Sequence, residues 1–381
     1  MMKGLFQLFA LSCYVPFLDA SLISRVAIIG GGPGGLALAA SLRNLNAGVA
    51  DIVVYESRAD IASTTVGGGV QLSGGAKMLK LLGILPDLEG CAEKVANVVG
   101  RNTHGSKVLG INLNRFKTRN SDSNSDILRT EEGAPLLFSI MRSSLQKILF
   151  KATQTPSVES NSSIHVQLNS SIKGIAQEEN QKYSVHLKDG TVGSDFDMVF
   201  GCDGVNSVIR EYIYCSQSPH CLLEDSNCVL NPLLIPHYNG LRVGFVLTKV
   251  DSAFNVRPDA RGLFRIWLGD GVFGLEGSFG SFEGPQHMLA LMYRDNRHAS
   301  VGTNTEWSAN SLLEFYQKKL NESGLNKVVE IQNLMNAADS SRCVDIGLKE
   351  ATIPLPTWSS GDGRVILMGD SAHAMYGKRY K

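Results

Sequence analysis

The sequence predicts an α/β fold that combines a parallel sheet with a second, mostly antiparallel sheet. Two observations carry this prediction. Glycine-containing turns follow short apolar runs at three places far apart in the chain, which is the pattern of strands that lead into helices. Before the last of these places, residues 240–295 alternate apolar and other side chains over long stretches separated by Gly and Asp, which is typical of antiparallel strands.

The first turn follows the apolar run from Val26 to Ile29, which is long enough for one buried strand, and it precedes a helical pattern from Leu36 to Leu45. Gly30, Gly32 and Gly35 give the spacing that opens a dinucleotide-binding unit. The first glycine allows a tight turn, the second lets the backbone approach a pyrophosphate, and the third lets the helix pack close to the strand. The N-terminus of such a helix offers free N–H groups and a positive dipole end to phosphates.

An acidic residue strengthens this interpretation. Residues 51–55 have the composition of a second strand, which ends at Glu56, 21 positions beyond Gly35. An acid about 20 residues after the glycines is where such folds place a partner for ribose hydroxyls. A carboxylate there also repels a 2′-phosphate, so we do not expect NADP at this site. The alternative is an ordinary strand–helix turn.

Length, composition and net charge limit the classes of protein to which the chain can belong. The 381 residues suffice for two domains or one large one, and 43% hydrophobic with 19% charged residues is typical of a soluble globular protein. The 36 basic and 36 acidic residues cancel. No electrostatic binding of nucleic acid is therefore expected.

Residues 1–20 differ from the rest of the chain. Lys3 precedes an apolar stretch from Leu5 to Leu18, interrupted by Pro16, and Ala20 offers a small residue for cleavage. This pattern predicts a signal peptide for the secretory pathway or an organelle, because the stretch is short for a membrane span. An N-terminal membrane anchor and an additional buried segment are the alternatives, and they would leave the protein membrane-associated or cytoplasmic.

Seven cysteines occur, at positions 13, 91, 202, 215, 221, 228 and 343. Cys215, Cys221 and Cys228 lie close together in the sequence, but their spacing matches no metal-binding signature, and no metal site is predicted. Unpaired buried thiols are favoured over a disulfide, which an oxidising compartment would permit.

The segment from 67 to 152 is predicted in three parts. Residues 67–72 have the composition of a glycine-rich turn, and the following helix ends at Gly83 and has one apolar face, formed by Ala76, Leu79 and Leu82. Residues 95–137 are polar and irregular, with an exposed loop over 118–126. Arg142 then begins an amphipathic helix whose apolar face consists of Leu145, Ile148, Leu149 and Ala152.

The second glycine turn follows a region of β-structure over 164–200, in which Asp189-Gly190 forms a hairpin turn. Asp203 lies in this turn, and a carboxylate there can accept hydrogen bonds from sugar or ribityl hydroxyls. Arg210 pairs either with Asp203 or with a phosphate. Alternatively, Asp203 and Ser207 only cap the following helix.

The third turn is Gly369-Asp370, after a predicted strand from Arg364 to Met368. Before it, residues 310–320 form a predicted helix with an inward face of Leu312, Leu313, Tyr316 and Leu320. Ligands of open α/β sheets bind at the carboxyl ends of the strands. The three turns can therefore converge on one extended cofactor.

Together these motifs resemble the single-component flavin-dependent aromatic hydroxylase-type monooxygenases, which include para-hydroxybenzoate hydroxylase, kynurenine monooxygenase and zeaxanthin epoxidase. The resemblance covers residues 25 to about 375. It implies a Rossmann-like FAD-binding domain of the GR2 type with an interleaved, mostly antiparallel β-sheet substrate domain. The residues that it implies as cofactor-binding are Gly30, Gly32, Pro33, Gly34, Gly35, Glu56, Arg58, Arg142, Asp203, Gly204, Arg210, Gly369, Asp370 and Ala372.

The resemblance also implies a division of the chain. The expected parts are a signal or targeting segment (1–20), FAD-binding segments (21–95, 138–214 and 351–381), an insertion toward the substrate domain (96–137) and the substrate domain (215–350).

Two departures from the family pattern stand out. Gly74-Gly75 occupies a position where the family usually has Asn, and the chain ends at Lys381, eleven residues after Asp370, without the family's proline, glycine-rich turn and helix. We therefore expect a C-terminally truncated form.

The implied reaction uses FAD, NAD(P)H and O2 to hydroxylate or epoxidise an apolar or aromatic small molecule through a flavin C4a-hydroperoxide. The protein binds, orients and excludes water, and no catalytic side chain is assigned. The aromatic residues of the 240–295 sheet either line the substrate pocket or belong to the core: Phe245, Phe264, Trp267 and Phe273. The alternatives are an FAD-dependent dehydrogenase or reductase on the same fold, and an inactive FAD-binding truncated isoform.

Overall fold

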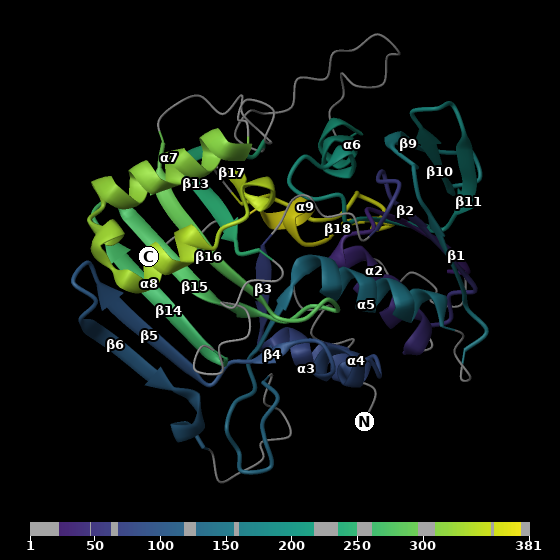
Figure 1. Ribbon diagram of the computed structural model, residues 1–381. Helices are drawn as coiled ribbons and strands as arrows, with labels where there is room; N and C mark the ends of the chain where they lie inside the picture. The colour runs from purple at the N-terminus through teal and green to yellow at the C-terminus, as the bar shows by residue number, and fades with distance from the viewer. Residues whose placement is uncertain are drawn as a thin grey trace. The chain divides into compact units, whose positions relative to one another are not determined.

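The computed structural model describes residues 23–45, 47–61, 68–117, 127–155, 160–216, 235–249, 261–295, 309–351 and 354–374 (Figure 1). The predicted signal segment and the predicted loop over 118–126 lie outside the described residues. The chain divides into two compact units. The first comprises Met1–Ile61, Thr153–Pro236 and Glu350–Lys381, and the second comprises Ala62–Ala152 and His237–Lys349.

These limits differ from the predicted domain boundaries, which placed residues 62–95 and 138–152 with the FAD-binding segments. The predicted boundaries follow the cofactor motifs rather than the density of contacts, and they stay a prediction.

A five-stranded parallel sheet organises the first unit. Its order is β18-β12-β1-β2-β8, and every neighbouring pair is parallel. The strands are β1 (Arg25–Ile29), β2 (Asp51–Tyr55), β8 (Ser163–Gln167), β12 (Met198–Gly201) and β18 (Val365–Leu367). The apolar runs of β1 and β2 are buried at four of five positions each, as expected for parallel strands covered on both faces.

Helix α2 spans Pro33–Asn44 and begins three residues before the predicted start. Proline at the first helical position explains the early start, because its fixed φ suits the helix and its missing N–H would have no partner there. Two more helices of this unit follow the other glycine turns: α6 (Val208–Ser216) and α9 (Asp370–His373).

A three-stranded antiparallel sheet completes the first unit, in the order β11-β10-β9. Its strands are β9 (Ile172–Gln177), β10 (Tyr183–Leu187) and β11 (Val192–Phe196). The predicted hairpin turn at Asp189-Gly190 is confirmed, since β10 pairs antiparallel with β11 and Gly190 has φ 91°. The sheet packs into the same apolar cluster as α6 and β18, through residues such as Tyr183 and Ile209.

The preference for unpaired thiols is wrong at Cys215, which is disulfide-bonded. Cys91, Cys202 and Cys343 are free, so the partner of Cys215 lies outside the described residues.

A seven-stranded sheet organises the second unit, in the order β17-β13-β16-β15-β14-β5-β6. Its strands are β5 (Asn97–Asn102), β6 (Lys107–Asn112), β13 (His237–Leu247), β14 (Leu263–Gly269), β15 (Val272–Phe279), β16 (Gln286–Arg294) and β17 (Val344–Glu350). The predicted antiparallel arrangement within 240–295 is confirmed by the pairings of β13, β16, β15 and β14.

The prediction of irregular structure over 95–137 is wrong for β5 and β6. Strand β5 pairs in parallel with β14, more than 160 positions later in the chain, and β6 pairs with β5. The composition of β5, Asn-Val-Val-Gly-Arg-Asn, gives only a weak local signal for a strand. The strand forms because a partner strand far away in the sequence stabilises it.

The prediction of a glycine turn over 67–72 is also wrong for residues 69–72, because Gly69–Leu72 forms strand β3, while Gly67 lies outside the described residues. It belongs to a small sheet, β3-β7-β4, with β7 (Phe138–Met141) and β4 (Glu93–Lys94). Gly69 serves close packing rather than a turn, since a Cβ atom there would lie 1.8 Å from the ring of Phe279.

Helices cover one face of the large sheet (Figure 1). They are α7 (Ala309–Glu322) and α8 (Val329–Asn336), with short 3-10 turns at Leu325–Lys327 and Ser340–Arg342. The predicted inward face of α7 is confirmed, since Leu312, Tyr316 and Leu320 are buried in the core with Leu313 packed against it. Trp267 lies in this core, fully buried.

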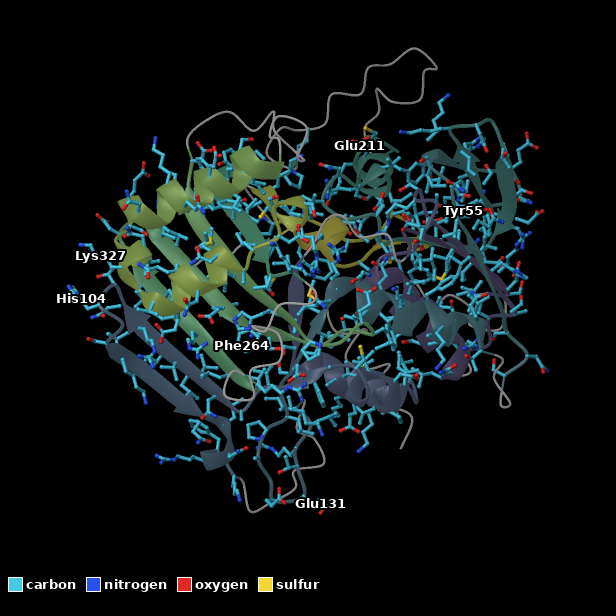
Figure 2. All side chains as sticks on the ribbon, in the orientation of Figure 1. Tyr55, His104, Glu131, Glu211, Phe264 and Lys327 are labelled. Carbon is cyan, nitrogen blue, oxygen red and sulfur yellow. The ribbon has the colours of Figure 1, made fainter. Side chains whose placement is uncertain are left out.

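The remaining helices of the second unit are α3 (Gly74–Leu81), α4 (Leu85–Glu89), α5 (Arg142–Gln154) and the 3-10 turn Leu113–Arg115. The predicted apolar faces of α3 and α5 are buried. Phe264, labelled in Figure 2, is 1% exposed and packs edge-on against Phe279. Among the described residues, no helix is both long and apolar enough to cross a membrane.

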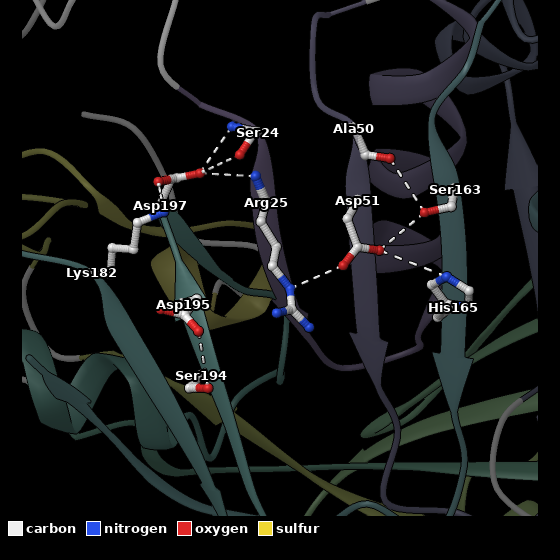
Figure 3. Close-up of polar contacts among 10 residues, drawn as sticks. All are labelled: Ser24, Arg25, Ala50, Asp51, Ser163, His165, Lys182, Ser194, Asp195 and Asp197. Atoms are coloured by element: carbon white, nitrogen blue, oxygen red, sulfur yellow. Dashed lines mark hydrogen bonds and ion pairs between the residues drawn. The ribbon is translucent and has the colours of Figure 1, made fainter.

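The carboxylate of Asp197 holds the start of β1 (Figure 3). Its Oδ2 accepts hydrogen bonds from the backbone N–H groups of Ser24 and Arg25, both at 2.9 Å, and its Oδ1 accepts one from Lys182 Nζ at 2.9 Å. Burial alone would raise the pKa of Asp197, but the hydrogen bonds from Lys182, Arg25 and Ser24 outweigh it and hold the pKa below its ordinary value. An ionised side chain from a distant part of the sequence therefore fixes the start of β1.

We expect Asp197→Asn to lower the free energy of unfolding by about 1–3 kcal/mol near neutral pH, because the amide oxygen can keep the Ser24 and Arg25 N–H groups but the NH2 group then faces the ammonium of Lys182 and the negative charge is lost. The ionised carboxylate stabilises the fold fully above its unfolded-state pKa of about 3.9, and this contribution is lost as pH falls through the lower folded-state pKa. The difference between wild type and variant should therefore shrink in acid. Urea denaturation followed by circular dichroism at several pH values measures it.

Asp195→Asn is the matched control, since Asp195 is exposed two residues away and contacts only Ser194 in Figure 3. It should change the free energy of unfolding by less than about 0.5 kcal/mol. Equal effects of the two substitutions would contradict the role assigned to Asp197.

Candidate functional site

The three predicted glycine turns lie at one edge of the parallel sheet. Strands β18, β12 and β1 are neighbours, with Ile29 opposite Gly201 and Gly201 opposite Leu367. The hydrogen bonding continues into the turns, since Cys202 N donates to Ile29 O at 2.7 Å and Met368 N donates to Gly201 O at 2.9 Å. The carboxyl ends of three adjacent strands therefore carry the turns, which is where open α/β sheets bind ligands.

The first turn has the backbone geometry that its glycines predict. Gly30 has φ 106°, which L side chains rarely adopt, and a Cβ atom there would lie 2.4 Å from the carbonyl oxygen of Cys202. A Cβ atom on Gly35 would lie 2.0 Å from Gly30 O, so this glycine lets α2 pack against the end of β1.

The N-terminus of α2 is open to an anion. Gly32 is the N-cap residue, no side chain caps the helix, and its first turn holds no acidic residue. Cβ atoms built on Gly32 and Gly34 would have no neighbour within 4 Å, so space is open in front of their backbone within the described structure. Pro33 has no N–H, and the first N–H groups of a helix have no partner inside it. The remaining amides and the helix dipole favour a phosphate there.

Glu56 is fixed beside this turn as an ionised acceptor. It is 5% exposed, and its Oε2 accepts a hydrogen bond from Gly31 N at 2.9 Å. Arg58 donates to Oε1 from its backbone N and from Nε, both at 2.9 Å. Burial alone would raise the pKa of Glu56, but hydrogen bonds from Arg58 and from the Gly31 N–H outweigh it and lower the pKa. Arg58 thus orients Glu56, and its predicted contact with the cofactor stays a prediction.

Asp203 both caps a helix and keeps one oxygen unused. Its Oδ2 accepts hydrogen bonds from Val208 N at 2.8 Å and Ile209 N at 3.3 Å at the start of α6. Its Oδ1 is buried and accepts no hydrogen bond within the part of the chain that the structure describes. Burial raises the pKa of Asp203, against hydrogen bonds from Ser207 and the helix amides that lower it. An unused buried acceptor indicates a donor from a ligand.

Arg210 does not form the predicted ion pair with Asp203. Its buried guanidinium donates to Ser371 O at 2.9 Å and to Val205 O at 2.6 Å, so it connects the second turn to the third. The predicted cap at Ser207 is present, since its Oγ accepts from Arg210 N at 2.9 Å. Contact of Arg210 with a cofactor stays a prediction.

The third turn depends on a serine that the sequence analysis did not single out. Ser371 is fully buried, and its Oγ donates to Gly201 O and accepts from Met368 N. Gly369 and Asp370 are exposed beside it, whereas Ala372 is 3% exposed in the core. Ala372 can therefore reach a ligand only through its backbone. The signal for Ser371 was its position directly after the strand-end aspartate.

Gly204 and Arg142 complete the predicted set. Gly204 follows Asp203 in the second turn with φ 79°, and a Cβ atom there would have no neighbour within 4 Å. Arg142 is exposed at the start of α5, and its backbone N donates to Gly68 O. It belongs to the second unit, whereas the other thirteen predicted residues belong to the first.

The arrangement suits an elongated ligand with a diphosphate between hydroxyl-bearing groups. Open helix amides accept the diphosphate, while Glu56, Asp203 and Asp370 offer carboxylate oxygens for hydroxyls. This donor and acceptor set fits FAD.

Comparisons with known proteins agree with this geometry. The family model described as FAD binding domain matches residues 24–221. A curated relative, 3-amino-4-hydroxybenzoate 2-monooxygenase from Streptomyces cremeus, is 26% identical over 361 residues, covering 92% of this chain and 72% of the relative.

Two solved structures show the likeness of fold. HpxO from Klebsiella pneumoniae, complexed with FAD and uric acid, has a TM-score of 0.65 and 17% identity over 93% of this chain and 75% of its own. A protein from Photorhabdus luminescens subsp. laumondii TTO1, described as an FAD-containing monooxygenase, has a TM-score of 0.65 and 17% identity over 93% of this chain and 83% of its own.

We expect Gly32→Ala to weaken FAD binding by at least about tenfold, because a methyl group would stand between the diphosphate and the helix amides. Gly32 has φ −69° and open space for a Cβ atom, so the free energy of unfolding of the cofactor-free protein should change by less than about 1 kcal/mol. Titration of the cofactor-free protein with FAD, followed by flavin fluorescence, measures the affinity.

Gly35→Ala is the contrasting variant. Its added methyl group meets a backbone oxygen, so it should lower stability itself. A Gly32→Ala protein that binds FAD as tightly as wild type would contradict the placement of the diphosphate.

Proposed function

The chain belongs to the FAD binding domain family of FAD-dependent monooxygenases, and from that premise we propose that it uses NAD(P)H and O2 to hydroxylate or epoxidise a small apolar or aromatic molecule. The observation that carries the proposal is the row of three turns on β18, β12 and β1, with the unused buried Oδ1 of Asp203 among them. In a strand–helix turn that binds no ligand, a buried carboxylate oxygen is expected to have a hydrogen-bond donor from the protein.

Residues of the first unit hold the cofactor in this proposal. The amides at the start of α2 receive the diphosphate, and Glu56, Asp203 and Asp370 accept hydrogen bonds from hydroxyls. Arg58 and Arg210 keep these turns in place through Glu56 and through the carbonyls of Val205 and Ser371. When bound, FAD supplies the electron transfer and the reaction with oxygen, and the protein supplies binding, orientation and exclusion of water.

The kind of substrate is proposed from the relatives. The Streptomyces cremeus enzyme is named for an aminohydroxybenzoate, and the Klebsiella pneumoniae structure holds uric acid. Both compounds are small rings, which supports a ring compound as the substrate of this chain.

The test is oxygen incorporation. Purified protein should carry FAD, and a suitable aromatic compound should stimulate oxidation of NADH or NADPH and receive one atom from labelled O2. Stimulated oxidation of NAD(P)H without label in the product would favour the dehydrogenase or reductase alternative. Bound FAD without any stimulation by a broad set of ring compounds would favour the inactive isoform.

We also propose that residues 1–20 direct the protein into the secretory pathway or an organelle, on the basis of Lys3 and the apolar stretch from Leu5 to Leu18. A fluorescent reporter carrying residues 1–24 should enter a membrane-bounded compartment and lose the segment. A reporter that stays diffuse and keeps the segment would contradict this proposal.

We expect Asp203→Asn to weaken FAD binding about 10–100-fold near neutral pH, because it replaces the unused carboxylate oxygen by an amide NH2 group. Burial raises the pKa of Asp203 before FAD binds, and a hydroxyl donor would lower it again. Binding then favours the ionised form. The Kd for FAD should therefore rise as pH falls through this raised pKa, and the variant should lose that dependence.

Ser207→Ala serves as the control, since Ser207 caps α6 through Arg210 N and does not offer the unused oxygen. It should lower stability by about 1 kcal/mol and keep a pH dependence of FAD binding, moved to higher pH because loss of the Ser207 hydrogen bond raises the pKa of Asp203 further. An unchanged pH profile in Asp203→Asn would contradict the assigned role of Asp203.

A further inference from the structure

The chain contains three Asn-x-Ser sequences that neither the cofactor site nor the proposed reaction uses. They begin at Asn161, Asn169 and Asn321. In the secretory pathway, the asparagine of such a sequence, which is called a sequon, accepts an N-linked glycan. Because sequons also occur by chance, the place of each one in the fold has to decide. A glycan is bulky and hydrophilic, so its asparagine must be exposed and must leave the neighbouring structure intact.

Two other features of the chain are consistent with an oxidising compartment. Cys215 is disulfide-bonded, and disulfides persist in the lumen of the secretory pathway and are rare in the cytosol. Lys3 and the apolar stretch from Leu5 to Leu18 give the pattern of a signal peptide. Neither feature depends on the sequons. Thiol chemistry, the N-terminal sequence and the sequons therefore point to one compartment independently.

Asn161 is exposed on a backbone that its neighbours hold in place. The next residue, Ser162, donates a hydrogen bond from Oγ to Val49 O. Ser163 N donates to Ala50 O at 2.8 Å. The side chain of Asn161 makes no hydrogen bond to any residue that the structure describes. A sugar on its Nδ2 atom would therefore extend into solvent and displace no interaction.

The sequon at Asn161 lies at the edge of the parallel sheet opposite to the cofactor turns. Ser163 begins β8 and pairs with Asp51 at the start of β2, which pairs with Arg25 at the start of β1 (Figure 3). The glycine turns follow the other ends of β1, β12 and β18. Between Arg25 and Ile29, four steps of about 3.3 Å separate the two edges by about 13 Å. A glycan on Asn161 therefore leaves the cofactor turns open.

The strand that follows this sequon lies at the end of its sheet. The sheet order ends at β8, which pairs only with β2 among the strands that the structure describes. The free backbone groups of such an edge strand can pair with another chain, and proteins protect these edges. A glycan two residues before β8 places a bulky hydrophilic group beside this edge. It would therefore hinder association through the edge of the sheet.

The other two sequons fit a glycan less well. Asn169 has φ 54°, and its backbone N donates to the carbonyl oxygen of Arg58 at 3.0 Å. Because Arg58 orients Glu56, a glycan on Asn169 would lie beside the predicted cofactor acid. Asn321 already uses its side chain, since its Oδ1 accepts a hydrogen bond from Asn326 Nδ2 at 2.7 Å. Asn161 is the sequon asparagine that is exposed, unengaged and remote from the cofactor turns.

We propose that Asn161 carries an N-linked glycan, so that the protein passes through the endoplasmic reticulum. In the attachment step, Nδ2 of Asn161 bonds to the first sugar of an oligosaccharide carried on a lipid diphosphate. The bond between that sugar and the diphosphate breaks, the lipid diphosphate leaves, and Nδ2 releases one proton. The proposal rests on the targeting role proposed above for residues 1–20, and it selects the secretory pathway among the compartments named there.

The experiment follows the full chain, with its own residues 1–20, in cultured insect cells. Electrophoretic mobility is compared before and after treatment with peptide-N-glycosidase F. We expect the treatment to increase the mobility of wild type. Untreated Asn161→Gln and Ser163→Ala should each migrate faster than untreated wild type by one glycan. Ser163→Thr should keep the glycan, because threonine also offers the hydroxyl group that the sequon requires.

Asn169→Gln is the matched control, since it removes a neighbouring exposed sequon and should leave the glycan on Asn161 in place. The glycosidase converts a glycosylated asparagine into aspartate, so fragment mass spectrometry after treatment identifies the modified position. Asn161→Gln should also leave the Kd for FAD unchanged, because Asn161 lies at the opposite edge of the sheet.

Protection of the chain from added protease in isolated microsomes separates the possible failures. An unmodified Asn161 in a protected chain would overturn the inference and leave the targeting proposal standing, as would glycans on Asn169 or Asn321 alone. A chain that protease digests while the membranes are intact would overturn both. Binding of FAD by the same protein tests the proposed function separately in every case.

Discussion

The parallel pairing of β12 with both β1 and β18 is the constraint on which the candidate site depends. Each pairing fixes where a strand ends, and the bonds from Cys202 N to Ile29 O and from Met368 N to Gly201 O carry the register into the turns. A slip of one residue would turn every side chain of a strand to the other face of the sheet. The position of Asp203 relative to Gly30 is therefore set by long-range hydrogen bonds and not by the local sequence.

Within the site, polar groups divide between those that build the turns and those that remain for a ligand. Arg210 and Ser371 are buried and engaged with backbone groups of neighbouring turns. The Oδ1 atom of Asp203 and the amides at the start of α2 have no such role. Arg210 and Ser371 therefore keep the turns rigid. Because their polar atoms are already bonded to these turns, the turns cannot rearrange to give the Oδ1 atom of Asp203 a partner.

Much of this arrangement could be predicted from the sequence, and the failures have a common physical cause. The strands β1 and β2 are continuous apolar runs, and glycines at fixed spacing mark the turn between β1 and α2, so local pattern suffices. Strand β5 is polar and exists because β14 pairs with it, and β3 begins with a glycine because the ring of Phe279 lies against Gly69. In both cases the decisive partner is distant in the chain, as it is for the guanidinium of Arg210.

The aromatic residues of the large sheet also could not be assigned from the sequence alone, because their environment depends on strand pairing. Trp267 and Phe273 both belong to a sheet that the sequence predicts, and both were candidates for lining a pocket. Trp267 pairs with Gly274, so Phe273, one position earlier, must lie on the other face. Trp267 is buried under the helices and donates to Glu276, whereas Phe273 is 38% exposed. Composition cannot distinguish two aromatic residues of this kind. Their position along the strand can, once the pairing with the neighbouring strand is known, because alternation assigns every residue of a paired strand to a face. The same alternation that hides Arg265 and Glu276 beneath the helices turns Leu275 and Ile266 to the opposite face, so the composition of both faces follows from one register.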